Sequence, residues 1–122
     1  MQNSCIQYQI SAKIILFCQC EQCRKLTGSA YAANIVAHPE SVNWLRDEHL
    51  VKRHDAPAGH VFCSNCGSGL PFMNVRGTTL FIPAGSLDSE FNLRVTRNIF
   101  WGEISIWYES GLVANRCTGF PE

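Results

Sequence analysis

Two cysteine-rich stretches decide how the sequence is interpreted. The first, FCQCEQCRKLTG at residues 17–28, places Cys18, Cys20 and Cys23 within six positions. The second, VFCSNCGSG at residues 61–69, adds the pair Cys63 and Cys66. Cysteines in C-x-x-C pairs are a zinc-binding pattern where thiols stay reduced, because zinc prefers thiolate ligands in a tetrahedron. The spacing therefore predicts zinc coordination by these cysteines, rather than burial as inert apolar side chains.

Length and composition predict one domain, residues 1–122, with neither a nucleic acid nor a membrane as partner. The chain has 122 residues, of which 46% are hydrophobic, enough for one packed core. Its ten Lys+Arg balance its ten Asp+Glu, whereas phosphate binding depends on a surplus of cations. The N-terminal residues lack the pattern of a secretory signal, and no apolar run approaches the roughly 20 residues that span a bilayer. We therefore expect a cytoplasmic protein with reduced thiols.

The residue patterns predict a mainly β protein with little helix. Alternating apolar and polar residues are typical of half-buried strands, and β-branched and aromatic residues favour strands as well. Residues 38–45 are expected to form a turn with one helical turn after Pro39, because proline suits the first position of a helix. Short strands are expected at residues 6–11, 13–17, 49–55, 78–87 and 97–108, and towards the end of residues 29–38.

The cysteine spacing permits two zinc arrangements. In the first, Cys20, Cys23, Cys63 and Cys66 form one closed structural site, as in a zinc ribbon. Spacing alone favours this arrangement, because structural sites dominate all-cysteine zinc. In the second, Cys18 and Cys20 share one face of an extended backbone and hold a separate ion with Cys23, while Cys63 and Cys66 bind a second, structural ion. Three protein ligands with one exchangeable position are the signature of catalytic zinc.

Residues outside the cysteine stretches give weaker indications. Arg24, Lys25, Arg94 and Arg97 are candidate contacts for an anionic thiol, although exposed cations are the norm. His60 is three positions before Cys63 and is a candidate neighbour of the metal site; without a motif to place it, a surface or turn histidine is the favoured interpretation. The larger aromatic residues are expected mainly in the core of so small a domain. They are Trp44, Phe100, Trp101, Trp107 and Tyr108.

Four motifs resemble one known family. They are CQCEQCRKLTGSAYAAN at residues 18–34, FCSNCGS at residues 62–68, PAGSLD at residues 83–88 and WYE at residues 107–109. Together they resemble the glutathione-dependent formaldehyde-activating enzymes, whose namesake is S-(hydroxymethyl)glutathione synthase and to which centromere protein V is similar. The resemblance covers most of the chain, from about residue 6 to residue 109.

The resemblance implies a fold, a metal arrangement and an activity. The fold is a β-tent of coiled antiparallel sheets with zinc-binding cysteine knuckles. Two zinc ions are implied, a catalytic one on Cys18, Cys20 and Cys23 and a structural one on Cys63 and Cys66 with an N-terminal C-x-C. The resemblance therefore favours two separate ions, whereas spacing alone favours the single closed four-cysteine site. The implied activity is that of a carbon–sulfur lyase acting on the adduct of formaldehyde with glutathione or a similar thiol.

The sequence departs from the family at that N-terminal C-x-C. Met1 and Asn3 stand where the family has its cysteines, so either the chain begins late or the structural site lacks these ligands. Cys5 lies on the same strand face as Asn3 and is either a substitute ligand or an edge thiol. The competing hypothesis is a non-catalytic zinc module with a structural four-cysteine site that binds a protein partner. Such a module has no use for Cys18.

Overall fold

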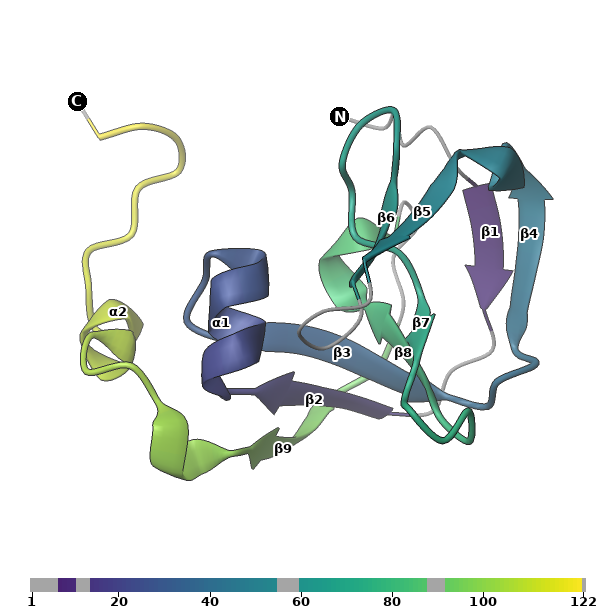
Figure 1. Ribbon diagram of the computed structural model, residues 1–122. Coiled ribbons are helices and arrows are strands. Elements are labelled where there is room, and N and C mark those ends of the chain that lie inside the picture. Colours follow the sequence, from purple (N-terminus) through teal and green to yellow (C-terminus); the bar gives the residue numbers. More distant parts are fainter. Residues whose placement is uncertain (1–6, 11–13, 55–59, 88–91, 122) are drawn as a thin grey trace.

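The structure is a computed structural model in which residues 7–10, 14–54, 60–87 and 92–121 are described (Figure 1). Its described elements are β1 (Gln7–Ile10), β2 (Ile14–Cys18), α1 (Glu21–Thr27), β3 (Ala32–Ala37), β4 (Val42–Arg46), η1 (Glu48–Leu50), β5 (Val51–His54), β6 (His60–Cys63), β7 (Phe72–Met73), β8 (Leu80–Pro83), η2 (Ala84–Ser86), β9 (Val95–Ile99), η3 (Trp101–Glu103) and α2 (Tyr108–Leu112). The predicted class, mainly β with little helix, is confirmed. None of the helices in the described part of the chain combines the length and apolar character of a membrane span.

A five-stranded open sheet with the strand order β7-β8-β3-β2-β9 contains the main hydrophobic cluster. Neighbouring strands are antiparallel except β2 and β9, which run parallel. The register places Ile15 opposite Ile35 and Ile35 opposite Ile82, so their β-branched side chains form one row across the sheet. All three are buried. This row, with Ala37 and Leu80, forms one hydrophobic cluster, to which β2, the strand that ends at Cys18, contributes Ile15.

Two two-stranded sheets complete the described strands, β1 with β4 and β5 with β6. β6 carries alternate buried residues, Val61 and Cys63, which form a second cluster with Leu70. This cluster is extended by partly buried apolar residues from other elements: Trp44, Leu50, Val51 and Phe72. The segment that leads to the second cysteine pair is therefore anchored by its own small core.

Most predicted strands are present, and two local expectations are wrong. β1, β2, β3, β5 and β8 all overlap the predicted ranges. The helical turn expected after Pro39 is absent, because Val42–Arg46 form β4 and pair with β1, a partner from elsewhere in the chain. The strand expected at residues 97–108 ends at Ile99, because Phe100 adopts a left-handed backbone with a φ of 55° and a 3₁₀ turn follows.

The C-terminal segment leads away from the sheets after β9 and carries α2 (Figure 1). Tyr108 makes edge contacts with Tyr31 and Trp101, each with ring centroids 5.8 Å apart. The expectation that the large aromatic residues lie mainly in the core is wrong here, since Phe100, Trp101 and Trp107 are exposed. These side chains leave the core because the chain no longer pairs with the sheet beyond Ile99.

Candidate metal centre

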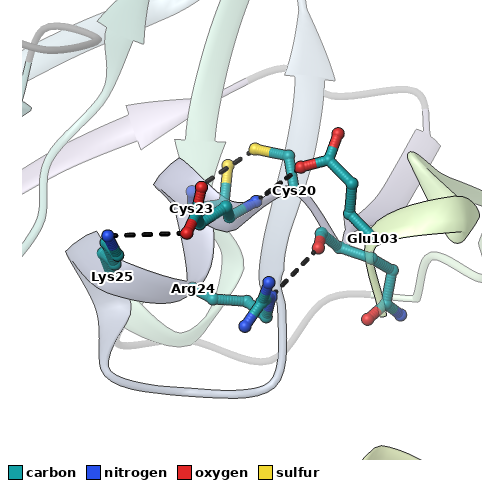
Figure 2. Close-up of polar contacts among 7 residues, drawn as sticks. Cys20, Cys23, Arg24, Lys25 and Glu103 are labelled. Atoms are coloured by element: carbon teal, nitrogen blue, oxygen red, sulfur yellow. Dashed lines mark hydrogen bonds and ion pairs between the residues drawn. The ribbon is translucent and has the colours of Figure 1, made fainter. Parts of the chain in front are cut away.

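Three cysteines converge where β2 passes into α1. Cys18 is the last residue of β2 and is buried, Cys20 caps the N-terminus of α1, and Cys23 lies in its first turn. Their Sγ atoms all lie within 4.8 Å of one another, and the Sγ atoms of Cys23 and Cys18 are 3.3 Å apart. Figure 2 shows the sulfur atoms of Cys20 and Cys23 close together at the start of the helix. The structure thus brings together all three cysteines of the first stretch.

The local sequence explains this convergence. Cys20 is extended, with φ −67° and ψ 155°, so it continues the direction of β2 before the helix begins. Its Sγ accepts a hydrogen bond from the backbone N–H of Cys23 at 3.3 Å, the capping role usually played by a serine or aspartate oxygen. The helix ends at Gly28, whose φ of 67° lets its N–H reach the carbonyl oxygen of Arg24 at 2.8 Å. A strand end followed by a capped helix converts the C-x-C-x-x-C spacing into one cluster.

Charged side chains near the cluster stabilise α1. Glu103 Oε1 accepts a hydrogen bond from the backbone N–H of Glu21 at 3.0 Å, which places a carboxylate at the helix N-terminus (Figure 2). Lys25 Nζ lies 3.5 Å from a carboxylate oxygen of Glu21, and Arg24 Nε donates to the carbonyl oxygen of Gln19 at 3.3 Å. The two cations that follow the cysteine motif therefore have partners on α1 and on the loop before it.

The three thiols differ in acidity. Burial raises the pKa of the Cys18 thiol. Burial also raises the pKa of the Cys23 thiol, and its hydrogen bonds with Cys20 and Cys18 raise it further. At Cys20 burial opposes ionisation, but hydrogen bonds from the Cys23 backbone and side chain outweigh it and lower the pKa. Three thiolates this close together repel one another, so a bound cation is what would let all three ionise.

The donor set and its spacing suit zinc. Zinc binds thiolate sulfur at about 2.3 Å in a tetrahedron, which separates neighbouring sulfurs by roughly 3.8 Å. The mutual distances of up to 4.8 Å among the Sγ atoms of Cys18, Cys20 and Cys23 are compatible with that geometry. Within the described residues this group has three members, whereas zinc takes four ligands. The three-cysteine group can therefore hold a metal ion.

The second cysteine pair lies apart from this group. Cys63 ends β6 and is buried, whereas Cys66 is exposed in the turn that follows. Neither belongs to the three-cysteine group, so the closed site of Cys20, Cys23, Cys63 and Cys66 that spacing favours is not formed. Cys63 is disulfide-bonded in this structure, and a second zinc on Cys63 and Cys66, which requires reduced Cys63, stays a prediction. Cys5 lies outside the described residues.

A cavity of about 460 Å³ adjoins the metal centre, and Cys23 is part of its wall. Its apolar wall includes Leu26, Val61, Leu70, Phe72 and Pro83. Its polar wall includes Thr27, Asn34, His60, Ser68 and Ser86. The sequence motifs gave no indication that residues from α1, β3, β6 and η2 enclose one space. A volume of this size lies in the usual range for small-molecule sites.

His60 is a wall residue of this cavity rather than a surface histidine. It is the first residue of β6, is half-buried, and stacks on Phe62 with ring centroids 5.3 Å apart. The proposed cationic contacts lie elsewhere: Arg94 and Arg97 are exposed, and Arg97 is on β9, the edge strand farthest from β7 in the main sheet. The structure thus brings a histidine, and not these arginines, to the cavity.

Gln19 is a residue of the site that sequence reasoning missed. It lies between two of the cysteines and its side chain is fully buried. Its Nε2 donates to Asn98 Oδ1 at 3.2 Å, and its backbone N–H donates to the carbonyl oxygen of Ile99 at 3.0 Å. These bonds attach the cysteine loop to β9. A glutamine within the motif carries no sequence signal for such a role, because its partner is distant in the chain.

Fold and site together define a small, mainly β protein with a three-cysteine group that can hold a metal ion. The family model described as glutathione-dependent formaldehyde-activating enzyme matches residues 3–103, and the chain belongs to this family. The resemblance seen in the motifs is thereby confirmed, and it implies glutathione-related formaldehyde activation. The crystal structure of a Rhodobacter sphaeroides protein, a structural genomics target, has the same fold. It matches with a TM-score of 0.59 and 14% identity over 76% of this chain and 91% of that chain. The comparison with curated proteins gave no match.

Proposed function

We propose that this protein is a zinc-dependent enzyme that forms and cleaves the carbon–sulfur bond of a thiol–formaldehyde adduct. The observation that carries the proposal is the position of Cys23, which belongs both to the three-cysteine group and to the wall of the cavity. A purely structural zinc site does not need an adjoining cavity. Family membership supports the substrate class, since the family is named for glutathione-dependent formaldehyde activation.

In this proposal Cys18, Cys20 and Cys23 hold the ion. Bound zinc would supply the positive charge that keeps a substrate thiol in its thiolate form. The cavity would place this thiol beside formaldehyde, and such positioning supplies a large part of the acceleration of a two-substrate reaction. Because the three ligand thiols must stay reduced, the proposal assigns the activity to a reducing compartment such as the cytoplasm.

His60 is the residue that we assign to proton transfer. When the adduct forms, the thiol gives its proton to neutral His60. The thiolate sulfur attacks the carbonyl carbon, the carbon–oxygen π pair moves to oxygen, and the imidazolium of His60 returns the proton to that oxygen. In the reverse direction neutral His60 takes the hydroxyl proton, the carbon–sulfur bond breaks and its electron pair returns to sulfur. The support for this role is the place of His60 in the cavity wall.

Exchange spectroscopy tests the proposal. Zinc-loaded protein is mixed with ¹³C-formaldehyde and, in separate samples, with glutathione and an uncharged thiol, and the exchange between free and thiol-bound formaldehyde is followed by NMR. We expect exchange above the spontaneous rate with at least one of the thiols. Cys18→Ser should abolish this exchange. Cys117→Ser, the same change at an exposed cysteine outside the three-cysteine group, should retain it. A spontaneous rate with every thiol would refute the enzyme assignment.

A further inference from the structure

The charge of the cavity wall indicates which thiol the site takes. Among the described residues that line the cavity there is no Asp, Glu, Lys or Arg. The wall is formed mainly by aliphatic and aromatic groups such as Leu26, Val61 and Phe72, with a few neutral polar side chains. Cavities that bind carboxylates or phosphates normally offer arginine, lysine or a set of backbone N–H groups. The wall residues that the structure describes offer no such cation.

The cations nearest in sequence to the cysteines do not compensate. Arg24 Nε is hydrogen-bonded to the carbonyl oxygen of Gln19, and Lys25 is paired with Glu21 on the exposed side of α1. Neither Arg24 nor Lys25 lines the cavity, although Cys23, Leu26 and Thr27 of the same helix do. The helix therefore turns its apolar side and its metal ligand towards the cavity and its cations away from it.

From these observations we infer that the thiol bound in the cavity carries an uncharged, predominantly apolar substituent and is not a peptide with free carboxylates. This inference rests on the proposed function and names its substrate class. An ionised carboxylate loses its hydration when it enters an apolar cavity and needs a compensating charge, which the described wall residues do not supply. An uncharged substituent gains from contact with the apolar wall and can use Asn34 or Ser68 for orientation.

A pair of thiols matched in size tests the inference. 3-Mercaptopropanamide and 3-mercaptopropanoate differ in one neutral or charged end group, and their binding to zinc-loaded protein is measured by calorimetry at one fixed pH. We expect the amide to bind at least tenfold more tightly than the acid. Equal or tighter binding of the acid overturns the inference, as does the absence of binding by both thiols.

A charge introduced into the wall provides the second measurement. Ser68 lines the cavity, whereas Ser64 is exposed in the same turn and does not. Ser68→Lys should shift the ratio of the two affinities at least tenfold towards the acid, and Ser64→Lys should leave it unchanged. Because the ratio is compared between variants, differences in acidity between the two thiols cancel. An unchanged ratio in a folded Ser68→Lys variant overturns the inference.

The two proposals fail in different ways. Accelerated formaldehyde exchange with both thiols, together with acid binding as tight as amide binding, overturns the inference and leaves the enzyme assignment intact. Selective binding of the amide without any exchange above the spontaneous rate supports the inference and refutes the enzyme assignment. Calorimetry requires no turnover, so the binding result is independent of activity.

Discussion

The end of α1 offers a prediction whose size follows from the backbone. Gly28 has a φ of 67°, and a Cβ built there meets no atom within 4 Å. Gly28→Ala therefore causes no clash, and its cost is conformational: about 1–2 kcal/mol for an L-residue in the left-handed region. Alanine also reduces the entropy of the unfolded chain, which offsets about 0.4–1 kcal/mol. We expect a net loss of roughly 1 kcal/mol in the free energy of unfolding.

Gly102→Ala is the matched control. Gly102 lies in a 3₁₀ turn, its φ is outside the left-handed range, and a Cβ there also meets no atom within 4 Å. Both variants change the unfolded chain equally, so their difference isolates the left-handed cost of about 1–2 kcal/mol. For a chain of this size this corresponds to melting temperatures that differ by roughly 4–8 °C, measured at one fixed zinc concentration. Equal melting temperatures of the two variants would refute the reasoning.

Three further predictions concern the core, the cysteine loop and the cavity. Ile35→Ala, at a completely buried side chain, should lower the free energy of unfolding in urea by about 2–5 kcal/mol. A loss below about 1 kcal/mol would mean that the isoleucine row is not the core. Asn98→Ala leaves the buried Gln19 Nε2 without its partner and should lower the free energy of unfolding by about 1–3 kcal/mol. Arg97→Ala, at an exposed residue of the same strand, should lower it by less than about 0.5 kcal/mol. Equal effects of these two would contradict the role given to Gln19. His60→Gln should slow formaldehyde exchange about 10²–10⁴-fold with zinc content unchanged, and a rate within twofold of the unaltered protein would remove His60 from the mechanism.

Local patterns predicted the strands because burial alternates along them. β8 shows this alternation of buried and half-buried residues, and its Ile82 meets Ile35 in the register. The same local reasoning failed at Val42–Arg46, where Pro39 suggested a helical turn. The pairing of this segment with β1 is a long-range interaction that no residue near Pro39 encodes. Tertiary pairing therefore outweighed the local signal.

Helix α1 was missed although its ends carry recognisable signals. Glu21 lies in its first turn, Arg24 and Lys25 in its last, and Gly28 directly after it, as helix ends prefer. The N-cap is Cys20, a residue type without a recognised capping preference, and the helix is too short for an apolar period. The helix matters functionally because it carries Cys23.

The three-cysteine group was one of two zinc arrangements that the spacing permits, and only the family resemblance favoured it; the cavity had no signal in the sequence at all. Cys18, Cys20 and Cys23 are within six positions, so local backbone geometry alone brings their sulfurs together. The cavity wall combines residues from Cys23 to Ser86, which meet only after the strands have paired. For the same reason the sequence named His60 only as a candidate neighbour of the metal site and did not place it in a cavity wall. It also gave no indication that the arginines proposed as substrate contacts lie away from the cavity.

The proposed function requires a zinc ion held by three cysteine sulfurs with one exchangeable position. The most direct measurement is the zinc X-ray absorption spectrum of Cys66→Ser, which removes an exposed cysteine of the second pair and leaves the three-cysteine group intact. We expect three sulfur neighbours at about 2.3 Å and one lighter atom, with the sulfur number rising to four when a thiol is added. Four sulfurs before any thiol is added, or no bound zinc, would contradict it.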